Sequence, residues 1–162
     1  MIASLKKFTL HRSQLFPSIL VQEPLIIVTH AHHPLASMDT VELSELEQLA
    51  NPFFHIDWSF EVKRWQSKLV TTSGTEVEVP PQTAHDLLLR GIGAALLTRT
   101  LVANDLAAGR LVEIPVWGLP LLLRESVLVR LSREEKLPAA VNEFIRVFRE
   151  EARAYSKTSR ER

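Results

Sequence analysis

Thr83–Thr98, TAHDLLLRGIGAALLT, decides the fold class because a helix pattern passes directly into a buried-strand pattern. Residues 83–90 have the spacing of a capped amphipathic helix, and Gly91 suits the left-handed position at which such a helix stops. Residues 93–98 form a continuous apolar run, which predicts a strand buried on both faces. A helix followed at once by a buried strand is typical of an α/β protein.

The same alternation continues outward along the chain. Apolar runs and strict alternation predict further strands over residues 23–29, 53–56, 75–79, 111–116 and 121–131. Helical spacing predicts further helices over residues 40–50, 59–69, 101–108 and 138–155. Alternating strands and helices predict an α/β fold with three layers around a mixed, mostly parallel sheet.

Composition restricts the function classes. The 162 residues include 19 basic and 19 acidic ones, so the net charge is zero, which argues against nucleic-acid binding by this chain alone. There is no cysteine, which excludes disulfides, thiolate metal sites and a cysteine nucleophile. The sequence shows neither a signal peptide nor an apolar run long enough to span a membrane. We therefore expect a cytoplasmic protein without membrane association.

Two loops are the candidates for a ligand site, because ligands of α/β sheets bind at the carboxyl ends of the strands. They cover residues 55–59 and 80–83. The loops combine charge, an aromatic wall, hydroxyls and an amide, as suits a small polar ligand in a partly apolar cleft. The candidate effector-binding residues are His55, Asp57, Trp58, Ser59, Gln82 and Thr83.

Each candidate also has a purely structural interpretation. Thr83 at a helix N-terminus suits a carboxylate, since unpaired N–H groups favour an anion there, but it can equally cap its own helix. Gln82 either bonds an effector or faces water. Trp58 either lines a cleft or packs on the surface of an ordinary loop.

The histidines, serines and carboxylates raise the question of a metal or catalytic site. His30, His32 and His33 lie close together, with His55, His85 and Asp57 elsewhere, but HxHH is not a spacing that a metal site requires. No GxSxG elbow accompanies the serines, and the carboxylates of Glu76 and Glu78 suit a solvated strand face. We expect no metal, no cofactor and no catalysis.

Five phrases, in this order, resemble the effector domain of LysR-type transcriptional regulators. They are EPLIIVTHAHHPLA (23–36), VELSELEQLANPFFHI (41–56), TAHDLLLRGIGAALLT (83–98), LVANDLAAGRLVEIPV (101–116) and EKLPAAVNEFIRVF (135–148). The resemblance covers about residues 23–150. One departure is Thr98-Arg99, which stands where many relatives have a proline.

The resemblance implies a type-2 periplasmic-binding-protein-like lobe together with an incomplete second lobe. On this basis residues 1–22 are an arm or remnant of the first lobe, 23–131 the second lobe with both crossing strands, 132–155 the closing helix of the first lobe, and 156–162 a disordered tail. The family's helix-turn-helix and linker helix are not visible in the sequence, so we expect truncation at the N-terminus. DNA would then be contacted only through a head absent from this chain.

The resemblance also implies the function, which is sensing of a small polar or anionic metabolite by a bacterial transcription regulator. Binding would change the angle between the lobes and so the spacing of the DNA-binding heads. The apolar stripe of the last helix would need a partner, either a second copy of the chain or the N-terminal arm, so a homo-oligomer is expected. A solute-binding protein of the related two-lobed fold is the second hypothesis, and an enzyme is the third.

Overall fold

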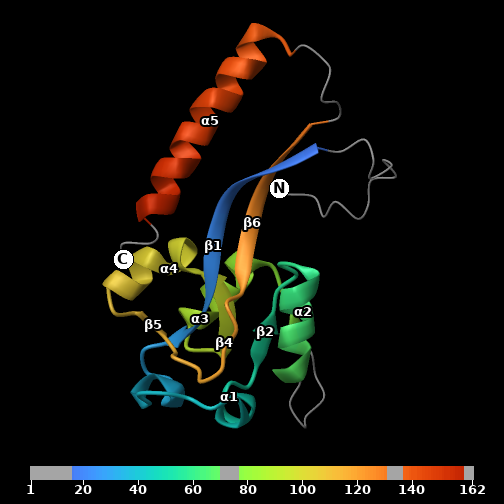
Figure 1. Cartoon of the computed structure of the whole chain (residues 1–162). Coiled ribbons are helices and arrows are strands. Elements are labelled where there is room, and N and C mark those ends of the chain that lie inside the picture. The colour runs from blue at the N-terminus through green and yellow to red at the C-terminus, as the bar shows by residue number, and fades with distance from the viewer. Residues whose placement is uncertain (1–15, 70–76, 131–136, 159–162) are drawn as a thin grey trace. The chain divides into compact units, whose positions relative to one another are not determined.

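The computed structural model describes residues 16–69, 77–130 and 137–158 (Figure 1). Its strands are β1 (Phe16–His30), β2 (Phe53–His55), β3 (Val77–Glu78), β4 (Ala94–Thr98), β5 (Leu111–Glu113) and β6 (Leu123–Arg130). Its helices are α1 (Leu43–Leu49), α2 (Phe60–Gln66), α3 (Pro81–Leu88), α4 (Arg99–Ala107) and α5 (Ala139–Thr158), with short 3₁₀ turns η3 (Pro34–Ser37) and η4 (Ser67–Leu69). Parts of five expectations lie outside the described residues, namely residues 1–15 of the arm, 75–76 and 131 of two strands, 132–136 of the closing segment and 159–162 of the tail.

The chain divides into two compact units. The first unit contains residues 1–22 and 125–162, and the second unit contains residues 23–124. Both β1 and β6 are continuous strands that contribute residues to each unit.

The mixed α/β sheet expected from the sequence is confirmed. The strand order is β3-β2-β4-β1-β5, with β6 pairing to β1. Parallel pairing joins β2 to β3 and β4, whose connections contain helices, as parallel strands require. The antiparallel pairs are β1–β4 and β1–β5, because β1 runs opposite to both of its neighbours. Among the named strands whose register is given, the parallel pairs are therefore β2–β3 and β2–β4.

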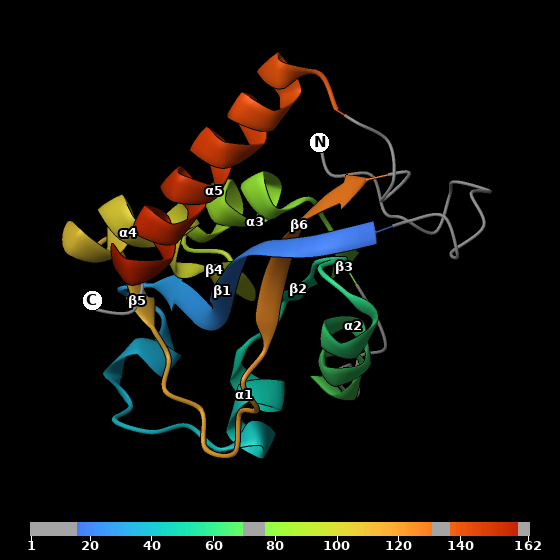
Figure 2. The same cartoon turned by 45° about the horizontal axis from the view of Figure 1, so that its top comes forward.

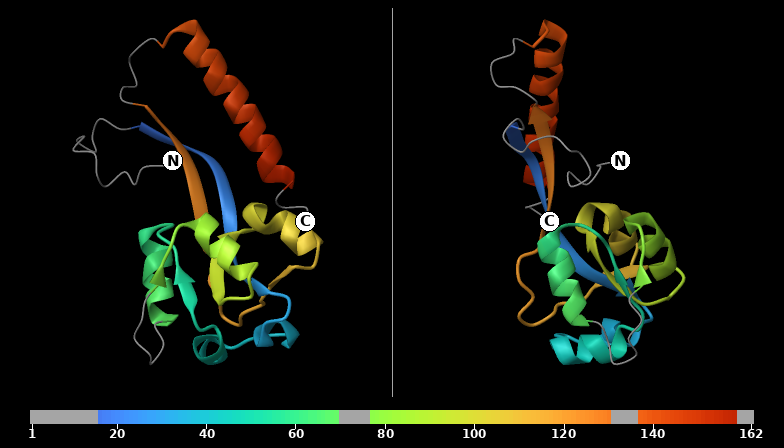
Figure 3. Two further views of the ribbon diagram at one scale, coloured as in Figure 1. Left: turned by 180° about the vertical axis from the view of Figure 1, so that it is seen from behind. Right: turned by 90° about the vertical axis from the view of Figure 1, so that its right-hand side faces the viewer.

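Helices cover both faces of this sheet in the second unit, which gives the three layers. Successive side chains of a strand point to opposite faces, so each buried strand feeds two cores. One core combines Leu25, Ile27, Ala94 and Leu96 with residues of α1 and α2. The other combines Ile26, Val28, Ala95 and Leu97 with residues of α3 and α4. Figure 2 and Figure 3 show the two helix pairs on opposite sides of the sheet.

A buried carboxylate ties α3 to α4. Asp105 is 6% exposed, and its Oδ2 lies 2.7 Å from His85 Nε2. Its Oδ1 accepts hydrogen bonds from Nε and NH2 of Arg110, at 2.8 and 2.5 Å. Burial alone would raise the pKa of Asp105, but the hydrogen bonds from His85 and Arg110 outweigh burial and hold that pKa below its ordinary value of 3.8.

Asp105→Asn should reduce the free energy of unfolding at pH 7 by about 2 kcal/mol, because it removes charge-assisted hydrogen bonds from a buried site. Since the folded-state pKa lies below the unfolded value, the carboxylate contributes its full stabilisation above about pH 4 and loses it as the pH falls through the folded-state pKa. The gap between the native chain and the variant should therefore narrow below pH 4. Urea denaturation over pH 2–7 measures this difference in stability, with the exposed Asp39→Asn as control. A gap that stays constant over this range would contradict the assignment.

The first unit presents an amphipathic helix. Four large apolar side chains of α5 are 40–61% exposed: Val141, Phe144, Val147 and Phe148. The rings of Phe144 and Phe148 stack, with centroids 5.7 Å apart. The helix continues to Thr158, beyond the expected end at residue 155. Among the described residues, no helix combines the length and apolarity needed to cross a bilayer.

Candidate functional site

The parallel strands of the second unit all end at one edge of the sheet. The register pairs His55 of β2 with Glu78 of β3, and the next amide along, that of Val79, donates to the His55 carbonyl at 3.0 Å. Because β4 runs parallel to β2, its last residue, Thr98, lies at the same edge of the sheet. The two loops singled out in the sequence, residues 55–59 and 80–83, therefore begin side by side.

Three helices begin at this edge. α2 starts at Phe60 shortly after β2, α3 starts at Pro81 after β3, and α4 starts at Arg99 directly after β4. The N-terminus of a helix carries unpaired N–H groups and a partial positive charge. The edge is consequently favourable for negative or strongly polar groups.

The loop after β2 presents two kinds of side chain. Asp57 is exposed, and Trp58 and Ser59 are partly buried. Ser59 caps α2, since its Oγ accepts a hydrogen bond from the amide of Val62 at 3.3 Å. His55 is only 4% exposed, and its ring lies edge-on to Phe53. The His55 side chain thus belongs to the core, and its carbonyl positions the neighbouring strand.

The start of α3 differs from the capping expectation. The N-cap is Pro80 and the helix begins at Pro81, so Thr83 lies inside the first turn and does not cap the helix. The reason is that proline suits the first helical position, where its missing N–H is not needed. Both Thr83 and Gln82 are exposed. The amide nitrogen of Gln82 lies 3.2 Å from His85 Nδ1 and 3.3 Å from Asp86 Oδ1.

Sequence reasoning missed three residues at the same edge: Glu23, Thr100 and Arg124. The antiparallel register pairs Leu25 of β1 with Thr98 of β4, which brings Glu23 opposite Thr100. The Thr100 hydroxyl donates to Glu23 Oε1 at 2.5 Å, and Arg124 NH1 donates to Glu23 Oε2 at 3.1 Å. The Glu23 side chain is 6% exposed, whereas that of Arg124 is 34% exposed. A buried carboxylate therefore holds a guanidinium that still reaches solvent.

Trp58 connects this cluster to the loop after β2. The guanidinium carbon of Arg124 lies 5.6 Å from the centroid of the Trp58 ring, within the range of a cation–π contact. The indole N–H of Trp58 donates to the carbonyl of Leu96 in β4 at 2.9 Å. The edge thus combines an aromatic surface, a held cation, a hydroxyl and an exposed carboxylate. Such a set can recognise a small polar or anionic molecule.

The histidines do not form a metal centre in the part of the chain that the structure describes. No group there of three or more His, Asp or Glu side chains is suitably placed to hold an ion. The rings of His30 and His32 contact each other edge to face, with centroids 5.1 Å apart.

Comparison with known proteins identifies one family. The model of the LysR substrate binding domain matches residues 8–153. No curated protein matches the chain by sequence.

Solved structures similar in fold include three regulatory domains. The effector domain of the transcriptional regulator AmpR of Pseudomonas aeruginosa has 15% identity and a TM-score of 0.67, over 91% of this chain and 70% of that one. The CcmR regulatory domain from Synechocystis, solved in complex with 2-PG, has 16% identity and a TM-score of 0.62, over 86% and 67%. The regulatory domain of MetR, a LysR family regulator from N. meningitidis, has 15% identity and a TM-score of 0.61, over 91% and 68%. At these identities the likeness concerns the fold.

Proposed function

Because the chain belongs to the LysR substrate binding domain family, we propose that its second unit binds a small polar or anionic metabolite at the sheet edge formed by β2, β3 and β4. The observation that carries this proposal is the cluster of Glu23, Thr100, Arg124 and Trp58 at the sheet edge where α3 and α4 begin. Family membership indicates a regulatory role and points away from catalysis.

Each group has a chemical task in the proposed site. Arg124 supplies a cation whose position is fixed by Glu23 and by the Trp58 ring, so little conformational entropy is lost when a ligand binds. The Thr100 hydroxyl and the exposed Asp57 suit hydroxyl and amine groups of the ligand. Gln82, Thr83 and Ser59 contribute polar groups at the starts of α3 and α2. A small ligand, 2-PG, is present in the CcmR regulatory domain, which supports this class of occupant.

Regulation follows if the ligand prefers one conformation of the domain over another, since only differential affinity can shift an equilibrium. Ligand binding would then change the output of a bacterial transcription regulator that contacts DNA through another domain. A cytoplasmic location and homo-oligomerisation are parts of the same proposal. The exposed apolar residues of α5, such as Phe144 and Phe148, support an oligomer.

A screen of C2–C6 mono- and dicarboxylic acids and hydroxy acids, read by thermal shift and followed by isothermal titration calorimetry of the hits, tests the site. Arg124→Met should weaken binding of the best acid at least about tenfold, because it removes a charged hydrogen-bond donor. Thr100→Val and Thr83→Ala should each weaken binding by about three- to tenfold, the range of one neutral hydrogen bond. Asp57→Ala should weaken the binding of hydroxy acids, because it removes the acceptor for their hydroxyl group. Arg64→Met, an exposed arginine on α2, is the matched control.

The test of the site is the comparison of acid affinity between Arg124→Met and Arg64→Met. If the hits bind all four site variants as tightly as the native chain, the proposed site is wrong. An affinity lowered equally by Arg64→Met would point to a general charge effect instead.

A further inference from the structure

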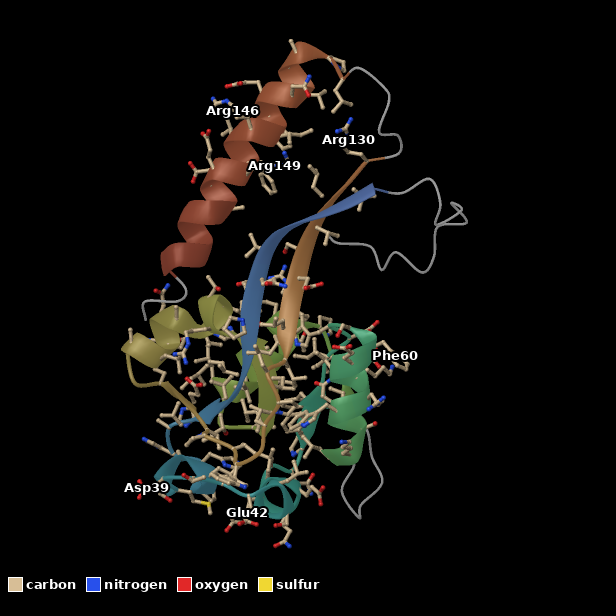
Figure 4. All side chains as sticks on the ribbon, in the orientation of Figure 1. Asp39, Glu42, Phe60, Arg130, Arg146 and Arg149 are labelled. Carbon is tan, nitrogen blue, oxygen red and sulfur yellow. The ribbon has the colours of Figure 1, made fainter. Side chains whose placement is uncertain are left out.

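The first unit contains a basic pocket between the end of β6 and one side of α5. Its volume is about 330 Å³, and it is lined by Arg130, Asn142, Ile145, Arg146, Arg149 and Glu150. Figure 4 shows Arg130 at the end of β6 and labels Arg146 and Arg149 on α5. None of these residues belongs to the second unit, so the pocket is separate from the site proposed above.

Arg146 is already neutralised by its own helix. It donates to both carboxylate oxygens of Glu143, at 2.5 and 3.0 Å, and to both of Glu150, at 2.7 and 2.9 Å. The hydrogen bonds to Glu143 and then to Glu150 raise the pKa of Arg146 above its ordinary value. The two glutamates are therefore engaged by Arg146.

The other two arginines lack such partners. The Nε of Arg130 is buried and has no hydrogen-bond acceptor. Arg149 forms no ion pair with any residue in the described ranges 16–69, 77–130 and 137–158. A buried donor without an acceptor is unfavourable, because it has lost its hydrogen bonds to water and no hydrogen bond within the protein replaces them.

The charge of the pocket defines what would satisfy these donors. Three arginines against Glu143 and Glu150 leave one positive charge in excess. We propose that this pocket binds a phosphate-type oxyanion, held by Arg130 and Arg149 with Arg146 kept in place by its glutamates. Guanidinium groups match the oxygens of such an anion in fork geometry, and one tetrahedral anion offers enough oxygens for two of them.

Calorimetric titration of the full chain with inorganic phosphate, against chloride at equal ionic strength, tests the pocket. The native chain should bind phosphate and not chloride. Arg130→Gln and Arg149→Gln should each weaken phosphate binding at least about tenfold, since each removes a charged donor. Arg149→Lys keeps the charge and should show a smaller loss, because the lysine lacks the planar fork. Arg64→Gln in the second unit should bind phosphate like the native chain.

Several outcomes would overturn the proposal. They are no phosphate binding by the native chain, equal binding by the Gln variants, or a loss as large in Arg64→Gln. Circular dichroism shows whether Arg130→Gln still folds. If it does not fold, the exposed Arg149→Gln still tests the pocket.

A parallel experiment uses phosphatidylcholine vesicles with and without phosphatidic acid. Binding only to the acidic vesicles, lost in Arg149→Gln without any response to free phosphate, would replace the small anion with a membrane surface.

Discussion

Gly93→Ala should destabilise the second unit by at least about 3 kcal/mol, the largest effect expected among Gly→Ala changes at Gly91, Gly93, Gly109 and Gly118. Gly93 has a φ of +69°, a conformation that costs other residues about 1 kcal/mol. A Cβ at this position would also lie 2.2 Å from the carbonyl oxygen of Pro52 and 3.0 Å from the ring of Phe54. Because the Pro52 oxygen is backbone and accepts the amide of Ala94, it cannot move without disturbing the β2–β4 pair.

Gly91 provides the matched control for this prediction. Its φ is +79°, but a Cβ there would meet nothing within 4 Å. Gly91→Ala should therefore cost only the backbone term, about 1 kcal/mol. Urea denaturation of both variants measures the difference, and equal losses of stability would show that the contact with Pro52 is not what requires glycine.

Trp58→Ala should lower the free energy of unfolding by about 2–3 kcal/mol and abolish the response to acids that bind at the sheet edge. The indole packs against both hydrophobic cores, donates to the Leu96 carbonyl and lies under Arg124. The expected loss is smaller than for a fully buried tryptophan, because Trp58 is partly exposed.

Trp58→Phe separates the roles of the indole. It keeps most of the apolar contact and loses the hydrogen bond to Leu96, so we expect a loss of about 1 kcal/mol and a retained but weakened acid response. Denaturation and calorimetry on both variants check this order. The proposed role of the ring in ligand recognition would be wrong if Trp58→Ala bound the best acid as tightly as the native chain.

The fold class was predictable because its signals are local. Continuous apolar runs such as residues 25–29 and 94–97 fix buried strands, and a glycine after an apolar helix marks where that helix ends. Strand lengths were harder to predict. β1 begins at Phe16, well before the apolar run, because it pairs with β6, whose sequence lies about a hundred residues away.

The candidate site was predictable in part. The rule that loops follow the carboxyl ends of parallel strands led to Asp57, Trp58 and Gln82, and the register of β2 with β3 brings their two loops together. Glu23 and Arg124 escaped prediction, because each looks like an isolated charge beside an apolar run until the pairing of β1 is known. Prolines 80 and 81 indicated the end of a strand, and the sequence did not reveal that they also begin α3.

The cluster around Glu23 has a consequence for the order of synthesis. Glu23 bonds to Thr100 and to Arg124, which follow it by 77 and 101 positions, so these contacts close very long loops. A chain emerging from the ribosome exposes β2, β3 and β4 before Arg124 exists. The contact between Glu23 and Arg124 can therefore form only after β6 has been translated and has reached β1.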